Sequence, residues 1–137
     1  MTITNDEYHA DSAVSASHLK AILQSPYHYW SRFVDPDRKP IEPTAAMRLG
    51  SLAHCAILEP DELLQRYGVC GARNTKAGKE QAAAMEAEGI EAVTSTDMAL
   101  ALSMAAAVRN HPAAAELLKQ GKAEQSFWWD DLPTGMR

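Results

Sequence analysis

Apolar positions recur with helical spacing along most of the chain, and they are densest in residues 47–60. Thr44 can cap the start of this segment and Pro60 can end it, which predicts a helix of about three to four turns. Apolar side chains cover most of its circumference. The remaining narrow polar sector is formed by Arg48, Ser51 and Cys55. Because helices with so narrow a polar sector are normally buried, we expect this helix in the core.

His54 lies outside that polar sector. At about 100° per residue, its side chain projects between Ile57 and Leu58, one turn after Gly50. A helical side chain leans over the preceding turn, so the absent side chain at Gly50 leaves open space beside the imidazole. A buried histidine that faces a gap is a candidate functional residue. The alternative is a core histidine whose ring nitrogens bond to backbone carbonyls, as most buried polar groups do.

Two short helices are predicted before this segment, after a loose or extended stretch over residues 1–14. Ser15 or Ser17 can cap the first, which ends at residues 25–26. Its apolar stripe is formed by Leu19, Ile22 and Leu23. The second helix, residues 27–33, is rich in aromatic side chains, which either belong to the core or stack on nucleic-acid bases. Three prolines among charged residues then predict a loop over residues 35–43.

Short strands alternate with helices in the second half of the chain. Thr94 begins the longest of these helices, with Asp97 three residues later as in a capping box. The predicted elements are helical turns at 61–67, a strand at 68–70, a helix at 79–88, a strand at 90–93, a helix to about residue 110 and a last helix at 113–120. No repeat and no linker-like tract divides them, which favours a single domain.

A local group of basic residues lies in the predicted loop at residues 71–79. Arg73, Lys76 and Lys79 stand there among glycines and small polar residues. Arginine and lysine side chains on such a loop are the usual contacts to nucleic-acid phosphates. A solvated surface loop without a ligand is the alternative.

Residues 122–130 alternate in polarity like a strand, with a turn predicted at 130–135 by Pro133 and Gly135. A return strand would begin at residues 136–137, where the sequence stops. An aromatic strand without a partner would be an adhesive edge. We therefore expect residues 1–137 to be a single incomplete domain, the N-terminal part of a larger sheet domain.

The composition limits the classes of protein to consider. Apolar residues make up 46% of the chain and its net charge is −5, so a core is available but no global positive field attracts nucleic acid. Cys55 and Cys70 have no metal-site spacing and are expected as free thiols in a reducing cytoplasm. The polar N-terminus does not resemble a signal peptide, and the apolar run at 98–108 is too short to span a bilayer. The sequence predicts a cytoplasmic protein with no membrane segment.

Several stretches form a recognisable series along the chain: Tyr8, residues 15–20 and 25–26, the Leu-Gly-x-x-x-His helix and Leu-Glu-Pro at 49–60, the basic loop at 74–80, and residues 123–126 with Trp128 or Trp129. Taken in this order, they resemble phage and prophage exonucleases of the RecE (exodeoxyribonuclease VIII) type. This resemblance covers nearly the whole chain. It implies an α/β fold of the PD-(D/E)XK restriction-endonuclease-like class, with this chain supplying most helices and the first strands, so that the fragment itself is an α-rich α+β structure.

The resemblance also implies an activity and a site. Its members degrade double-stranded DNA from 5′ ends with a divalent metal, and an annealing recombinase takes up the remaining single strand. It implies His54 as a ligand of Mg²⁺ or Mn²⁺, Glu124 as a catalytic acidic residue, and Arg73, Lys76 and Lys79 as DNA contacts. The implied partners are double-stranded DNA ends, the recombinase and further copies of the same chain in a ring-like oligomer. For Glu124, a solvated strand glutamate is the alternative.

The family's Asp and Asp-x-Lys on the following strands would fall beyond Arg137. Since a histidine and a glutamate alone hold a catalytic metal poorly, we expect this chain by itself to be inactive. A non-catalytic prophage remnant, or a module that binds DNA or protein, is therefore an alternative function. A zinc-binding regulator using His54 and Cys55 is disfavoured, because adjacent helical side chains diverge by about 100°.

Overall fold

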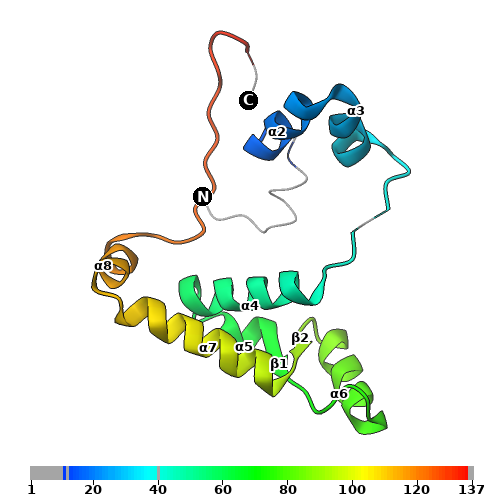
Figure 1. Cartoon of the computed structure of the whole chain (residues 1–137), viewed down its shortest axis with the longest axis vertical. Helices are drawn as coiled ribbons and strands as arrows, with labels where there is room; N and C mark the ends of the chain where they lie inside the picture. The colour runs from blue at the N-terminus through cyan, green and yellow to red at the C-terminus, as the bar shows by residue number, and fades with distance from the viewer. Residues whose placement is uncertain (1–10, 12, 40, 136–137) are drawn as a thin grey trace. The chain divides into compact units, whose positions relative to one another are not determined.

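The computed structural model describes residues 11, 13–39 and 41–135. The chain divides into two compact units, the first formed by the described residues of Met1–Glu42 and Glu124–Arg137 and the second by Pro43–Ala123 (Figure 1). Helices predominate and the strands form a small sheet, which confirms the α-rich α+β description. That the chain is one incomplete domain stays a prediction. The loose segment predicted over residues 1–14 lies almost wholly outside the described residues.

The first unit begins with α2 (Ala16–Gln24), followed by α3 (Pro26–Tyr29) and a π-helical turn, η1 (Trp30–Val34). Ser15 caps α2, since its side chain accepts a hydrogen bond from the His18 amide while the His18 ring accepts from the Ser15 amide. The two predicted helices are thus confirmed. The apolar stripe of α2 is exposed, however, and the helix buries only Ala21.

The aromatic side chains of α3 and η1 lie on two sides. Tyr29 and Phe33 pack against the ring of His18, with centroid distances of 5.9 and 4.2 Å from it. Tyr27 and Trp30 are 71% and 45% exposed. The prediction that the aromatic side chains belong to the core is therefore wrong for Tyr27 and Trp30. Helix α2 covers only the side of the segment that carries Tyr29 and Phe33.

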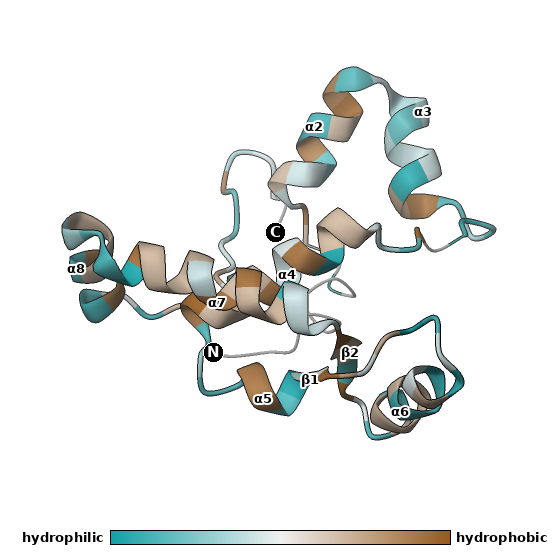
Figure 2. Cartoon of the chain, turned by 60° about the horizontal axis from the view of Figure 1, so that its bottom comes forward, coloured by the Kyte–Doolittle hydropathy of each residue, from teal (hydrophilic) through white to brown (hydrophobic). Residues whose placement is uncertain are grey.

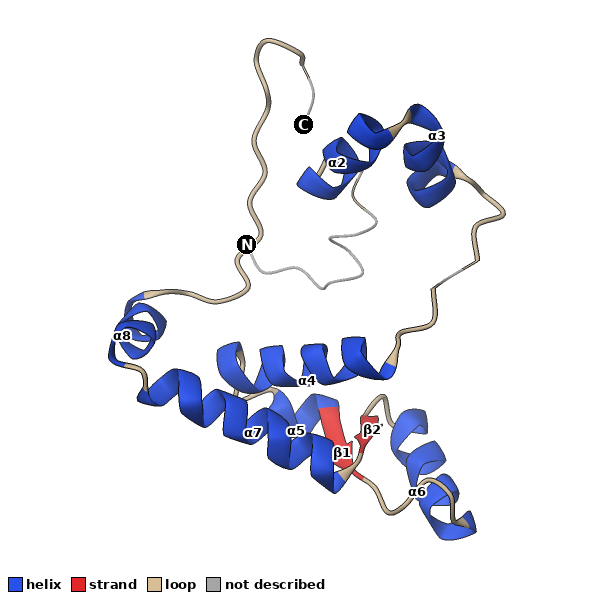
Figure 3. Ribbon diagram, in the orientation of Figure 1, coloured by secondary structure: helices blue, strands red, loops and turns tan. Residues whose placement is uncertain are grey.

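The second unit is organised around α4 (Ala45–Leu58) and α7 (Ser95–Asn110), which lie side by side (Figures 1 and 3). Apolar colours predominate on both helices in Figure 2. Ala101 and Ala105 of α7 are fully buried, and their small side chains let α4 approach closely. Both predicted helices are confirmed, including their caps, because Thr44 accepts from the Met47 amide and Thr94 from the Asp97 amide. The last helix, α8 (Pro112–Gln120), also lies where the sequence predicts it.

A short parallel sheet completes this unit. After the turn α5 (Leu63–Arg66), strand β1 (Tyr67–Val69) pairs with β2 (Glu91–Val93), with Gly68 opposite Ala92. Helix α6 (Lys76–Ala87) makes the crossover between them. It begins three residues earlier than predicted, because Thr75 caps it and Gly78 lies in its first turn. Within the described part of the chain, every helix is too short or too polar to cross a bilayer.

The strand predicted at residues 122–130 is wrong. These residues have no regular structure, and Glu124 adopts a left-handed conformation with φ of 51°. Alternating polarity suits a strand, but it does not fix an extended backbone, and the left-handed conformation of Glu124 interrupts one here. The turn after it is confirmed, since the Thr134 and Gly135 amides donate to the Asp131 carbonyl at 3.2 and 2.7 Å. The return strand predicted at 136–137 lies outside the described residues.

Candidate functional site

Helix α4 has one covered and one open face. The covered face packs toward α7 and is formed by Leu52, Ala53, Cys55 and Ala56. The open face is formed by Met47, Gly50, Ser51 and His54. Placing Cys55 in a polar sector was wrong, since it is 3% exposed. The pattern identified a narrow polar sector, but the position of α7 decides which sector is covered.

His54 is exposed, contrary to the burial expected from the sequence. The gap beside it is confirmed, because a Cβ built at Gly50 would have no heavy atom within 4 Å outside the local helix backbone. An exposed imidazole beside an open space can accept a ligand or a metal without displacing the core. His54 therefore remains the best candidate ligand of the described residues.

Contacts at its carboxyl end hold α4 in place. Arg109 of α7 donates to the Ala56 carbonyl at 2.6 Å, which ties the last turn of α4 to its neighbour. Glu59, the C-cap residue, forms a two-pronged pair with Arg66 at 2.8 and 3.2 Å. Cationic side chains satisfy terminal carbonyls and favour the negative end of the helix dipole. The helix that carries His54 is thus fixed from one side and open on the other.

Cys55 does not share a site with His54. Its thiol is buried and donates to the Glu59 carbonyl at 3.7 Å, while His54 lies on the open face. Burial raises the pKa of the Cys55 thiol, which disfavours the thiolate that zinc requires. These contacts weigh against the zinc site that the sequence already disfavoured.

The predicted DNA contacts lie on different structures. Arg73 is in the loop after β1, and its guanidinium donates to the Ala92 carbonyl of β2. Lys76 and Lys79 are exposed in the first turns of α6, and Lys76 lies 3.8 Å from Glu80. Whether these three side chains contact DNA stays a prediction. The two lysines are available to solvent, whereas Arg73 also has a structural contact.

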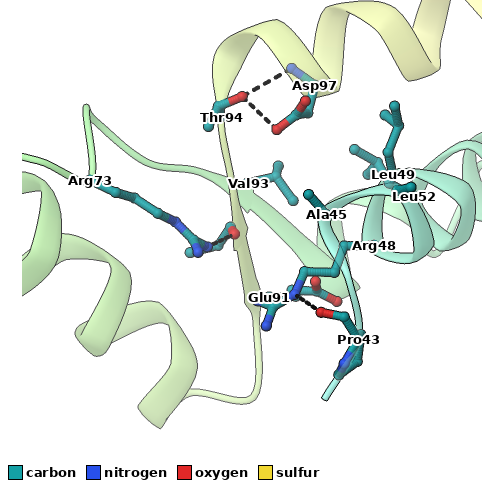
Figure 4. A pocket seen from close by; sticks show the side chains of 12 residues that line it. Pro43, Ala45, Arg48, Leu49, Leu52, Arg73, Glu91, Val93, Thr94 and Asp97 are labelled. Atoms are coloured by element: carbon teal, nitrogen blue, oxygen red, sulfur yellow. Dashed lines mark hydrogen bonds between the residues drawn. The ribbon is translucent and has the colours of Figure 1, made fainter. Parts of the chain in front are cut away.

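A hollow of about 520 Å³ lies between the first turns of α4 and the strand β2 (Figure 4). Arg48 of α4 and Arg73 both line it, with Leu49, Leu52 and Val93 as apolar lining. Glu91 and Asp97 are its acidic members, and Asp97 accepts a hydrogen bond from the Thr94 hydroxyl at 2.7 Å. Sequence reasoning missed Arg48 as a site residue, because its place in the polar sector indicated only solvation.

Glu124 belongs to the other unit, in the irregular segment described above. That Glu124 and His54 share one metal stays a prediction. Among the described residues, no three histidine, cysteine or acidic side chains are grouped so as to hold a metal ion. Because Mg²⁺ and Mn²⁺ prefer several oxygen ligands, the described residues fit one ligand position rather than a complete site.

One sequence does match Asp-x-Lys, namely Asp37-Arg38-Lys39. It lies in a turn directly after η1, where the Asp35 side chain accepts from the Asp37 amide at 3.0 Å. The Asp35 carbonyl accepts from the Arg38 amide at 3.2 Å. A tight turn lacks the extended backbone that places a carboxylate and a lysine on one side of a sheet. This match is therefore a turn signal rather than a catalytic motif.

Comparison with known families bears directly on this site. A family model described as a PDDEXK-like domain of unknown function (DUF3799) matches residues 15–137. The chain belongs to this family. No curated protein and no solved structure matches the chain. Membership supports the PD-(D/E)XK superfamily predicted from the motifs, and with it a nuclease type of hydrolase.

Proposed function

We propose that this chain forms part of a metal-dependent 5′–3′ exodeoxyribonuclease that acts on double-stranded DNA ends, as its resemblance to RecE-type enzymes implies. In this proposal His54 is a ligand of Mg²⁺ or Mn²⁺ and Glu124 is the acidic catalytic residue. The enzyme works in the cytoplasm in phage-type recombination, where an annealing recombinase takes up its product. Further copies of the chain complete an oligomer around DNA.

The position of His54 is the observation that carries the proposal. It stands on the open face of a helix whose other face is packed against α7, and next to it Gly50 leaves a gap. A metal ligand must be held in place by its support while the metal side stays accessible. When bound, the metal would activate water and neutralise charge on the phosphate. The chain's own contribution is to orient the imidazole.

DNA binding is assigned to the basic side chains near β2 and α6. Lys76 and Lys79 would contact backbone phosphates, and Arg73 retains N–H groups beyond the one bonded to Ala92. We add Arg48, since it lines the same hollow as Arg73. The net charge of −5 makes such a local group necessary, because the whole chain does not attract DNA.

The test is degradation of linear double-stranded DNA labelled at the 5′ or the 3′ end, with Mg²⁺ or Mn²⁺. It compares this chain with the product of the complete reading frame that encodes it. The reading frame's product is expected to release 5′ label first, and His54→Ala should lower the rate at least about a hundredfold. Ser51→Ala, on the same open face, is the matched control and should retain activity.

Two outcomes would overturn parts of the proposal. If this chain cuts DNA without additional residues, the expectation that it is inactive alone is wrong. If neither this chain nor the product of the complete reading frame cuts DNA with either metal, the nuclease assignment fails. The alternative of a non-catalytic binding module is then favoured.

A further inference from the structure

We propose that His18 makes the start of α2 sensitive to acid, because the helix is capped there by an imidazole that must stay neutral. The cap belongs to the first unit, and the proposal does not rest on the nuclease assignment. Its consequence is a helix start that is formed at neutral pH and loosens as the pH falls below about 6.

The cap is a reciprocal contact between Ser15 and His18. The Ser15 hydroxyl oxygen accepts from the His18 amide at 3.4 Å, and Nδ1 of the His18 ring accepts from the Ser15 amide at 3.0 Å. In the usual form of this capping box, a glutamate or glutamine stands where His18 does. Histidine can replace it only while Nδ1 carries no proton and the ring's N–H is on Nε2. The contact therefore requires one tautomer and one charge state of the ring.

Protonation of the ring removes the acceptor. An imidazolium has a donor on each nitrogen and a backbone amide can only donate, so the Ser15 amide loses its partner. The added charge also lies at the positive end of the helix dipole. The first turn of α2 holds no acidic side chain to offset it, and Asp11, which precedes the helix, accepts from the Ala13 amide at 2.7 Å. The cap is therefore present above the ordinary titration range of histidine and is lost as the pH falls through that range.

The side chains packed against the ring supply no compensating negative charge. The uncharged rings of Tyr29 and Phe33 face it, with centroid distances of 5.9 and 4.2 Å. Arg32 places a cation 5.6 Å from the centre of the Phe33 ring, so an imidazolium would compete with it for that ring. In the part of the chain that the structure describes, no acidic side chain forms an ion pair with His18. Because the His18 ring joins α2 to α3 and η1, loss of the cap also loosens the contact between these helices.

His28 shows how a similar contact can tolerate either charge state. Its Nδ1 lies 2.6 Å from the Ser25 hydroxyl oxygen at the start of α3. A hydroxyl both donates and accepts, so it donates to a neutral ring and accepts from a protonated one. A backbone amide allows no such reversal, so protonation breaks the contact at His18 and not at His28. Helix α8 also begins at a histidine, His111, which accepts from the Ala114 amide at 3.3 Å, but that ring is exposed and water can replace the lost partner.

The experiment follows the full, ¹⁵N-labelled chain by NMR between about pH 8 and about pH 5, the range in which histidine titrates. Imidazole ¹⁵N shifts at the upper pH should show His18 with its proton on Nε2. The exchange rate of the Ser15 amide is then divided by the rate for an unfolded chain at the same pH. The resulting protection should fall about threefold or more as His18 titrates, which corresponds to the loss of a helix cap.

Two variants separate this cap from other effects of acid. In His18→Gln the side chain accepts at any pH, so the protection of the Ser15 amide should no longer change with pH. His28→Gln is the matched control, because it removes another imidazole from the start of a helix in the same unit, and it should keep the wild-type dependence. Circular dichroism checks that each variant retains its helices. The tautomer of His18 in the wild-type chain gives a result even if a variant does not fold.

The proposal is wrong if His18 carries its proton on Nδ1 at the upper pH, since the ring could not then accept from the Ser15 amide. It is also wrong if protection of the Ser15 amide does not change while His18 titrates. The same pH dependence in His18→Gln and in the wild-type chain would assign the effect to another group. None of these outcomes bears on the nuclease proposal, whose test requires metal and cleavage.

Discussion

Replacing Gly50 by alanine tests whether the face of α4 that carries His54 is open in solution. Glycine in a helix interior is less favourable than alanine by about 1 kcal/mol, because it has more conformational freedom to lose on folding. An added Cβ at this position meets no heavy atom within 4 Å outside the local helix backbone. The substitution therefore adds helix propensity without a clash, and the free energy of unfolding should rise by about 0.5–1 kcal/mol.

Thermal unfolding followed by far-UV circular dichroism measures this change. For a unit the size of Pro43–Ala123, a gain of 1 kcal/mol corresponds to a rise in Tm of about 4–8 °C. Gly89→Ala is the matched control, since its Cβ also meets nothing within 4 Å but its φ is +77°. Alanine is strained in that conformation, so the control should lose about 1 kcal/mol.

A lower Tm for Gly50→Ala would refute the reasoning. It would mean that another part of the protein packs on this face in solution, and the gap beside His54 would then be filled. The control excludes a trivial explanation, because both substitutions add the same methyl group and differ in backbone conformation. If the two variants changed Tm alike, the effect would not report on the open face of α4.

Two other substitutions test the packing of the second unit. Gly78→Ala should lower the free energy of unfolding by about 2 kcal/mol or more, because the added Cβ would lie 2.2 Å from the Ala72 carbonyl oxygen. This loss should exceed the gain in helix propensity. A urea unfolding midpoint equal to that of wild type would contradict the prediction. Arg109→Ala should lower the free energy of unfolding by about 1 kcal/mol, because it removes the hydrogen bond to the Ala56 carbonyl. Arg109→Lys should restore part of this loss. An unchanged urea unfolding midpoint in Arg109→Ala would show that this bond does not join α4 to α7.

The helices could be predicted from the sequence because their signals are local. Thr44, Thr94 and Ser15 each accept from the amide three residues later, as their positions suggested. The start of α6 shows the limit of this logic. The sequence predicted Gly78 in a loop, yet it lies in the first turn of α6. Glycine is required there because a larger side chain would strike the Ala72 carbonyl. That close approach is a tertiary contact, and no local pattern reveals it.

The covered face of α4 could not be predicted for a related reason. Periodicity divides a helix into sectors, but it does not say which apolar sector meets another element. The buried alanines of α7 pack against the face of α4 that carries Leu52 and Ala56, and this packing leaves His54 exposed. The strand expected at 122–130 failed for a different reason, because alternating polarity does not fix an extended backbone and Glu124 adopts a left-handed conformation within the segment.

The proposed metal ligand His54 and the proposed catalytic residue Glu124 differ in how the structure supports them. His54 stands on a long helix whose position is fixed by buried packing and by Arg109, so its backbone is already ordered before any ligand binds. Glu124 lies in an irregular segment at a φ of 51°, in the left-handed region that residues other than glycine seldom adopt. Sites on rigid elements hold geometry more accurately than sites on loops. Support of this kind is present for the proposed metal ligand His54, whereas the role of Glu124 stays a prediction that the fold does not yet support.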